Sequence, residues 1–280
     1  MPLGRAAAML LLAPALALMA LVFLLPIGWF LWGSLAELGT FAEVTEEMRA
    51  VLGSRAVLGA IVNTNWIALV VTLLVLLIGY PVAYALSRAR GLAFTLILIC
   101  IVLPYFTSVI VRTYAWMVLL GRNGLINQVL LGTGLIGEPL ELLYNRLSVI
   151  IGMTYVLLPY MVLTLYAAMK AVDPSLLRAA EGMGASPVMV FLRVFLPLTR
   201  HGVMAGSLIV FILAIGFFVT PALMGGPGDV MIAMLIEREV ELTQNWPVAA
   251  MMTIVLLAVT LALYALYGRF AEQAKGAFAR

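Results

Sequence analysis

Residues 170–202 read KAVDPSLLRAAEGMGASPVMVFLRVFLPLTRHG and form a polar segment between two long apolar stretches. Asp173-Pro174 and Ser186-Pro187 each place a capping side chain directly before a proline. This pattern is typical of a helix start, because a proline at the first helical position loses only an N–H that has no partner. The segment therefore predicts two short helices that begin at these two prolines.

Glycine marks the end of the first short helix. Gly182 and Gly184 lie between the two predicted starts, where a helix can end or turn sharply. We expect the second short helix to end before Pro197. The first helix has one apolar face with small residues at its centre. The residues on this face are Leu176, Leu177, Ala180, Met183 and Gly184. A compact apolar knob of this kind, projecting from a membrane, suits insertion into a groove of a partner protein.

Outside this segment the chain is almost entirely apolar. Hydrophobic residues make up 65% of its 280 residues and charged residues 10%, so a soluble fold would lack polar residues to cover its surface. A membrane-spanning helix needs about 20 apolar residues, and six uncharged stretches are long enough. We predict an all-α, polytopic membrane protein whose single domain covers residues 1–280, with spans at about 7–33, 58–87, 92–120, 147–169, 202–224 and 247–268.

The distribution of charge predicts the orientation. With the N-terminus inside, the inner segments hold ten of the 16 basic residues, and the outer segments hold ten of the 13 acidic residues. The positive-inside rule then places both termini and the loop 170–201 in the cytoplasm. The first stretch is long for the apolar region of a cleaved signal peptide, so we interpret it as the first span. The excess of basic over acidic residues follows from this topology and does not indicate binding of nucleic acid.

The loop 170–201 resembles the EAA motif of the inner-membrane permeases of binding-protein-dependent ABC importers, and we call it the EAA loop. Ala179 and Ala180 match the two alanines of the motif, and Gly184 matches its glycine. Arg178 stands where the motif has glutamate. The resemblance implies that the loop contacts an ATPase through Arg178, Ala179, Ala180, Glu181, Gly182, Gly184 and Pro197.

Three further regions resemble the spermidine/putrescine-type branch of these permeases. They are residues 63–84, 103–114 and 217–226, in the same order and at matching spacing. The resemblance implies that the chain forms half of a solute pathway with a second, homologous permease, together with a dimer of cytoplasmic ABC ATPases and a periplasmic solute-binding protein. The implied solute is a polyamine such as spermidine or putrescine, and the alternatives are an aminophosphonate, an amino acid derivative or ferric ion.

The chain contains no GxxxxGK[ST] phosphate loop. Its only lysines are Lys170 and Lys275, and neither follows such a glycine pattern. ATP and Mg²⁺ are therefore expected on the partner ATPase, and no cofactor is expected on this chain. We predict a transport subunit, not an enzyme, in contact with the lipid of a bacterial inner membrane.

Arg112 is the one charged residue that we predict inside a span. It lies about 21 residues past Gly91, or roughly 30 Å along a straight helix, which places it near the outer interface. There its side chain either extends to the periplasmic surface or lines the pathway. Because proline can kink a helix, the candidates for a pathway or gate include one proline: they are Tyr105, Thr107, Ser108, Arg112 and Pro221.

The predicted outer segments are acidic. Residues 33–58 and 121–146 are long enough for short helices at the membrane surface, and residues 225–228 predict the start of a flexible outer hairpin. The acidity favours a cationic solute or a basic partner surface. No acid lies inside any predicted span, so a polyamine would pass over aromatic faces and backbone carbonyls, or past carboxylates of the partner permease.

Two other classes of protein remain as alternatives. A stand-alone secondary transporter usually needs ionisable groups within the membrane for ion coupling, and here only Arg112 qualifies. A membrane-embedded enzyme needs clustered polar groups, whereas the single histidine, His201, is predicted at a membrane edge. The single cysteine, Cys100, is predicted within a span. We therefore expect neither catalytic residues nor a metal site.

Overall fold

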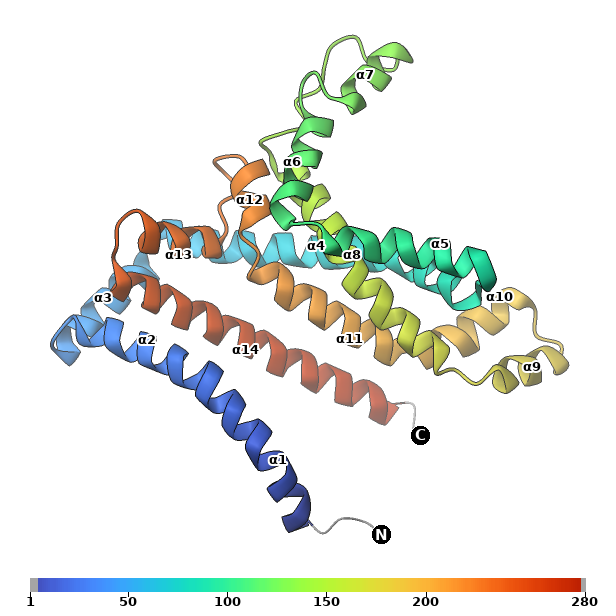
Figure 1. The fold of residues 1–280 in the computed structure, drawn as a ribbon, viewed down its shortest axis with the longest axis horizontal. Coiled ribbons are helices and arrows are strands. Elements are labelled where there is room, and N and C mark those ends of the chain that lie inside the picture. Colours follow the sequence, from blue (N-terminus) through green and yellow to red (C-terminus); the bar gives the residue numbers. More distant parts are fainter. Residues whose placement is uncertain (1–4, 278–280) are drawn as a thin grey trace. The chain divides into compact units, whose positions relative to one another are not determined.

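The computed structural model describes residues 5–277, and these residues form helices and connecting loops without any β-strand (Figure 1). They divide into two compact units. Unit 1 comprises the chain up to Leu58 together with Leu235–Ala258, and unit 2 comprises Gly59–Met234 together with the chain from Val259. The all-α fold class that the composition predicts is confirmed.

Unit 1 begins with one long apolar helix. It runs from α1 (Arg5–Met19) through the π-helix η1 (Ala20–Leu24) into α2 (Leu25–Ala36). All side chains from Leu11 to Trp29 are exposed, as expected of a helix whose apolar surface meets lipid or another subunit. The other helices that belong to this unit wholly or in part are α3 (Phe41–Gly53), α4 (Arg55–Arg88), α13 (Ile232–Glu241) and α14 (Trp246–Ala277).

Helix α8 (Arg146–Lys170) forms the centre of unit 2. Its side chains Met153, Leu157, Met161 and Leu165 are spaced four residues apart and are at most 1% exposed. It packs against four other helices of the unit, α5, α6, α11 and α12. The other α-helices that lie wholly in unit 2 are α5 (Gly91–Val102), α6 (Val109–Leu120), α7 (Leu125–Gly132), α9 (Pro174–Gly182), α10 (Pro187–Val190), α11 (Leu196–Ile215) and α12 (Val219–Met224).

Small residues let α11 approach α8 closely. Gly202 and Gly206 are buried, one turn apart, on the side of α11 that faces α8. A Cβ atom at Gly202 would overlap Ala168, and one at Gly206 would lie 2.7 Å from the sulfur of Met161. Membrane helices commonly pack through such contacts, because lipid provides no hydrophobic force that would bring them together.

The helices are long and apolar enough for a membrane protein. Among the described residues, five of them could each span a bilayer, and a bent pair makes a sixth span if it counts as one. The five are Leu11–Ala36, Arg55–Arg88, Arg146–Lys170, Pro187–Ile215 and Trp246–Ala265, and the bent pair is Gly91–Phe106 with Val109–Gly132. The structure therefore agrees with a polytopic protein, and it differs from the predicted ranges in two places.

The predicted third span, 92–120, is wrong as a single straight helix. The chain bends by 106° between α5 and α6, after the 3₁₀-helix η2 (Leu103–Phe106). Pro104 interrupts the helical hydrogen bonds, and Thr107 takes an extended backbone conformation with its hydroxyl donating to the Pro104 carbonyl at 2.7 Å. A straight-helix distance from Gly91 therefore does not locate Arg112.

The predicted end of the second short helix before Pro197 is also wrong. Helix α10 continues through the π-helix η3 (Phe191–Phe195) into α11. In η3 the N–H of Leu196 bonds to the carbonyl of Phe191, five residues back. This wider turn accommodates the following proline, whose ring would otherwise clash with the carbonyl four residues before it. The helix breaks instead at residues 216–218, before α12.

Candidate functional site

The EAA loop contains both helix starts that the sequence predicts. The carboxylate of Asp173 accepts a hydrogen bond from the backbone N–H of Ser175 at 2.8 Å, directly before α9. This bond holds the pKa of the Asp173 carboxyl below its usual value. The hydroxyl of Ser186 accepts from the N–H of Met189 at 3.4 Å and caps α10. Both predicted starts are confirmed.

The end of α9 requires a left-handed backbone. Gly184 has a φ of +85°, and its N–H bonds to the carbonyl of Glu181 at 2.9 Å. The N–H of Ala185 bonds to the carbonyl of Ala180 at 3.2 Å, which completes a Schellman motif. A Cβ atom at Gly184 or at the helical Gly182 would meet nothing within 4 Å. Only backbone strain therefore opposes a larger residue at Gly184 within this chain.

The apolar face predicted on α9 is divided in the structure. Leu176 is 48% exposed and Met183 is 83% exposed, whereas Ala180 is only 6% exposed. Helix α9 packs on α10 and η3, so Ala180 is covered within this chain. The placement of Ala180 on an exposed knob is therefore wrong, and the exposed apolar tip consists of Leu176, Met183 and Val188. The other residues matched to the motif are exposed: Arg178, Ala179, Glu181, Gly182, Gly184 and Pro197.

An aromatic cluster joins the EAA loop to α4. The rings of Phe191 and Phe195 meet the ring of Tyr84 edge to face, at centroid distances of 5.4 and 5.3 Å. The guanidinium of Arg88 lies 5.3 Å from the centre of the Tyr84 ring. The packed rings hold the second half of the loop against α4. This cluster was not predicted from the sequence, although the four-residue spacing of Tyr80 from Tyr84 and of Phe191 from Phe195 is a visible signal.

Three of the predicted pathway residues lie on the bend between α5 and α6. Tyr105, Thr107 and Ser108 are all exposed. The ring of Tyr105 packs on Tyr160 of α8, at a centroid distance of 5.3 Å. The two rings and Thr164 border a cavity of about 390 Å³, and none of the residues that line it is charged.

The other two pathway candidates differ in their surroundings. Arg112 lies in the first turn of α6, its Nε is buried, and its guanidinium has no hydrogen-bond or ion-pair partner within the described residues. Pro221 is buried at the third position of α12, where a helix does not use the N–H that proline lacks. Pro221 therefore lies just after the break at residues 216–218 and not within a continuous helix, and its role in the pathway or gate stays a prediction.

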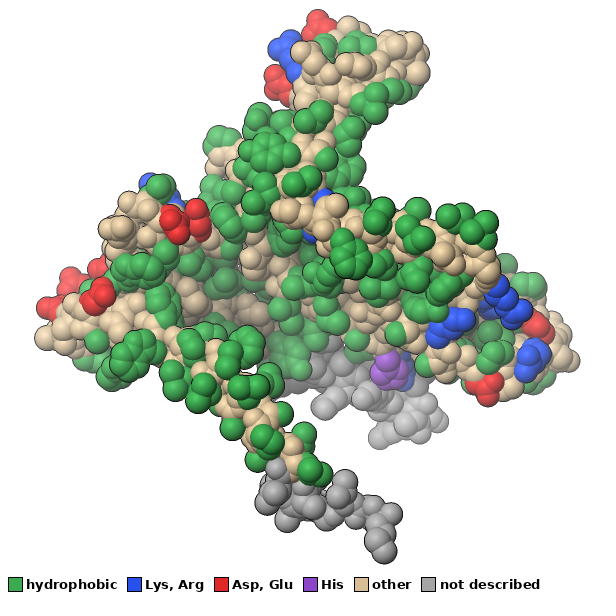
Figure 2. Space-filling view, in the orientation of Figure 1, with side chains coloured by type: hydrophobic (Ala, Val, Ile, Leu, Met, Phe, Trp, Pro, Cys, Tyr) green, Lys and Arg blue, Asp and Glu red, His purple; other side chains and the backbone are tan. Residues whose placement is uncertain are grey.

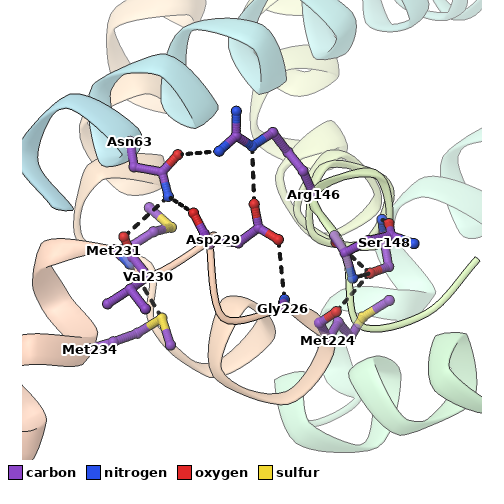
Figure 3. Close-up of polar contacts among 11 residues, drawn as sticks. Asn63, Arg146, Ser148, Met224, Gly226, Asp229, Val230, Met231 and Met234 are labelled. Carbon is purple, nitrogen blue, oxygen red and sulfur yellow. Dashed lines mark hydrogen bonds and ion pairs between the residues drawn. The ribbon is translucent and has the colours of Figure 1, made fainter. Parts of the chain in front are cut away.

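A polar network that the sequence analysis missed holds the loop between α12 and α13 (Figure 3). The Nε of Arg146, at the start of α8, forms an ion pair with Oδ1 of Asp229 at 3.0 Å. Arg146 also donates from Nη2 to Oδ1 of Asn63 in α4 at 2.8 Å. Asp229 accepts from the backbone N–H of Gly226 at 3.1 Å, and Asn63 donates to the carbonyl of Gly228 at 3.0 Å.

This Arg146 network (Arg146, Asp229 and Asn63) ties the loop 225–231 to α4 and α8. The Asp229 side chain is 8% exposed and the Arg146 side chain 47%. The flexible hairpin predicted at residues 225–228 is therefore wrong. No local pattern could have indicated the network, because Arg146 and Asp229 are 83 residues apart.

Helix α12 is also held against α6 and α8. The hydroxyls of Thr113 in α6 and Thr220 in α12 lie 3.0 Å apart, and the hydroxyl of Ser148 donates to the carbonyl of Met224 at 2.7 Å. A Cβ atom at Gly152 of α8 would lie 2.6 Å from the methyl carbon of Thr220. The short helix after the break at residues 216–218 is thus packed as tightly as a continuous span.

Comparison with known sequences decides the family. Residues 75–275 match the family described as the binding-protein-dependent transport system inner membrane component. The chain belongs to this family. It is a permease subunit of an ABC importer, a multi-pass protein of the inner membrane, and a transport subunit rather than an enzyme. The resemblance that the EAA loop carries is confirmed.

Individual relatives cover most of the chain. The spermidine/putrescine transport system permease protein PotB of Haemophilus influenzae is 37% identical over 198 residues, which are 70% of this chain and 69% of the relative. PotB of Escherichia coli K12 is 35% identical over 202 residues, which are 72% of this chain and 74% of the relative. The inner membrane ABC transporter permease YdcU of Escherichia coli K12 is 34% identical over 227 residues, with 75% of this chain and 72% of the relative covered.

Solved structures support the fold. A chain of a bacterial alginate ABC transporter, crystallised with its pentasaccharide-bound periplasmic protein, superposes with a TM-score of 0.73 at 20% identity, over 95% of this chain and 93% of that chain. A chain of an amino acid ABC transporter gives a TM-score of 0.53 at 14% identity, over 80% and 97% of the two chains. At these identities the similarity describes the helical architecture and not the solute.

Proposed function

We propose that this permease imports a polyamine, such as spermidine or putrescine, with energy from ATP hydrolysis on a separate polypeptide. The observation that carries the proposal is the identity of 37% and 35% to two permeases named for spermidine/putrescine transport. The cavity beside the bend supports it, because Tyr105 and Tyr160 present aromatic rings there and aromatic faces attract ammonium groups.

The proposed complex contains this chain, a second homologous permease, a dimer of cytoplasmic ABC ATPases and a periplasmic solute-binding protein, within the lipid of the inner membrane. ATP and Mg²⁺ bind to the ATPases. This chain contributes half of the solute pathway and holds no cofactor of its own, and no nucleic acid takes part.

The EAA loop is the proposed contact with the ATPase. Its exposed tip of Leu176, Met183 and Val188 is suited to an apolar groove, with Arg178 and Glu181 beside it as polar contacts. Ala180 supports the tip from within the chain. Closure of the ATPase dimer would move the loop, and the aromatic cluster would carry that movement to α4 as a rigid-body displacement.

Both termini and the EAA loop are proposed to lie in the cytoplasm. Figure 2 displays Lys and Arg side chains gathered over the end of unit 2 that contains α9 and α10. Basic residues are enriched on the cytoplasmic side of inner-membrane proteins. The location of this basic surface therefore supports the proposed orientation.

An ATPase assay in proteoliposomes tests the solute. Both permeases, the ATPase dimer and the binding protein are reconstituted, and ATP hydrolysis is measured with spermidine, putrescine, an aminophosphonate, an amino acid or ferric ion. We expect only the polyamines to stimulate hydrolysis, by about tenfold over the unloaded binding protein. Stimulation by one of the other solutes and not by a polyamine would overturn the proposed solute and leave the importer assignment intact.

A further inference from the structure

Arg112 is a charged group without a hydrogen-bond or ion-pair partner in the described part of the chain. Its Nε is buried. It lies in the first turn of α6, where the partial positive charge of the helix N-terminus adds to its own. An unpaired cation in an apolar helix of a membrane protein is unfavourable, and such residues normally pair.

The spans of a second copy of the chain would not provide a partner either. None of the candidate spans of the described chain, including the bent pair, contains an aspartate or a glutamate. The buried acid of unit 2, Asp229, is already paired with Arg146. Two copies of this chain would therefore bring two guanidinium groups and no free carboxylate to the membrane-spanning region.

Large apolar side chains near Arg112 in the sequence are uncovered, and the polar residues Thr107 and Ser108 are exposed beside them. Phe106 is 82% exposed, Val111 61% and Tyr114 53%. The intervening Thr113 is 1% exposed and is bonded to Thr220 of α12. Helix α6 thus packs one face inside unit 2 and leaves another face, with Arg112 at its edge, without a partner in the described chain. Such a face is complementary to a protein surface that carries a carboxylate among apolar groups.

We propose that the segment from Phe106 to Tyr114 contacts the second permease subunit and that a span of this subunit supplies an aspartate or glutamate to Arg112. In one respect the inference rests on the proposed function: an unpaired guanidinium would repel a polyamine, so the counter-charge comes from the partner and not from the solute. An ion pair at this place also fixes how the two subunits sit against each other, because wrong pairings leave buried charges uncompensated.

Charge exchange between the subunits tests the inference. The chain is co-expressed with the second permease and the ATPase, and the amount of second permease that co-purifies with the tagged chain is measured. Arg112→Glu is expected to lower that amount by about tenfold or more, and Arg112→Lys to keep it near wild type. Each aspartate and glutamate in the spans of the second permease is then replaced by arginine in turn. One of these replacements is expected to restore co-purification with the Arg112→Glu chain.

Arg146 provides a matched control. Its acid, Asp229, lies in the same chain, 3.0 Å from its Nε. If Arg146→Glu lowers the amount of second permease that co-purifies, Asp229→Arg in this chain should restore that amount. No replacement in the second permease should restore it. The two arginines therefore separate a contact between subunits from a contact that holds one subunit together.

Two results would overturn the inference. One is normal co-purification of the Arg112→Glu chain, and the other is a loss that no replacement in the second permease restores. If Arg112→Glu assembles normally and changes which solute stimulates ATP hydrolysis, the guanidinium faces the solute instead. The assay measures assembly without any solute, so its outcome does not depend on whether the solute is a polyamine.

Discussion

The EAA loop and the loop 225–231 are held in opposite ways. Around α9 the EAA loop is shaped by hydrogen bonds between near neighbours, such as the bond from Ala185 to Ala180, and only its second half, at Phe191 and Phe195, packs on α4. The loop 225–231 is held by side chains from distant parts of the sequence, Asn63 in α4 and Arg146 in α8. A locally capped loop keeps its shape and leaves its tip free for another protein. A loop tied to two helices moves with them as one body.

The largest expected effect concerns topology, because a reporter fusion is active on one side of the membrane and inactive on the other. Reporter fusions after residue 186 should be active only as cytoplasmic reporters, and fusions after residues 48 and 232 only as periplasmic ones, because the basic residues flank the first position and the acidic residues flank the other two. A periplasmic reporter at residue 186 would contradict the EAA loop as the contact with the ATPase.

The next effect concerns the turn that ends α9. Gly184→Asp places a charged side chain at a φ of +85°, which costs about 1 kcal/mol in backbone strain. An unpaired charge in an apolar groove adds several kcal/mol. A loss of about 3 kcal/mol weakens binding more than 100-fold, so solute-stimulated ATP hydrolysis should be abolished while the spans still insert.

Three further variants sharpen this result. Gly184→Ala carries only the backbone strain and should weaken ATPase binding by about fivefold. Gly182→Ala makes the same exchange inside α9, where the backbone is helical and a Cβ atom also meets open space within this chain, so it should weaken binding less than Gly184→Ala does. Arg178→Glu, which restores the residue of the family motif, should be much milder than Gly184→Asp. Full transport by Gly184→Asp in proteoliposomes would contradict the proposed docking site.

A smaller effect is expected when the Arg146 network is broken. Asp229→Asn should lower the free energy of unfolding by about 2 kcal/mol, less than for a fully buried ion pair, because the Arg146 side chain is 47% exposed and solvent screens its charge. Thermal unfolding of the detergent-solubilised complex measures the loss. With Arg146→Gln and the double variant, the measurements form a double-mutant cycle. Strictly additive losses would contradict a coupled pair.

The smallest effect is expected at the cap of α9. The pKa of Asp173 is lowered in the folded loop, so the cap contributes stability above the ordinary carboxylate pKa of about 3.9 and loses it as the pH falls through the lowered value. Between about pH 5 and 8 this group should not change coupling. Hydrogen exchange at the amide of Ser175 should be slow in wild type and in Asp173→Asn, and faster in Asp173→Ala. Equal exchange in the two variants would argue against the cap.

The features that the sequence predicted are those that depend on a few consecutive residues. The helix starts at Pro174 and Pro187 and the turn at Gly184 need only a capping side chain, a proline or a glycine in the right order. The Arg146 network joins residues 83 apart, and no local pattern identifies such a pair. The bend of 106° after Pro104 depends on how α5 and α6 each pack on α8, because a proline alone does not set an angle.

The sequence predicted which residues belong to the candidate site better than it predicted how they are arranged. Helical periodicity shows which residues share a face, so Leu176 and Met183 were correctly grouped with Ala180. It does not show which other helix covers part of that face, and here α10 and η3 lie against α9. The expectation that the helix ends before Pro197 failed for a similar reason, because the π-helical turn before this residue makes room for the proline ring.

The π-helical turn in η3 also determines the rotational phase of α11. Such a turn holds one residue more than an α-helical turn, and one residue corresponds to about 100° of rotation about the helix axis. Without the extra residue, Gly202 and Gly206 would be rotated away from Ala168 and Met161, and bulkier side chains would meet α8 in their place. A one-residue deletion within Phe191–Phe195 would therefore change which side of α11 meets α8, although every side chain of α11 would keep its identity.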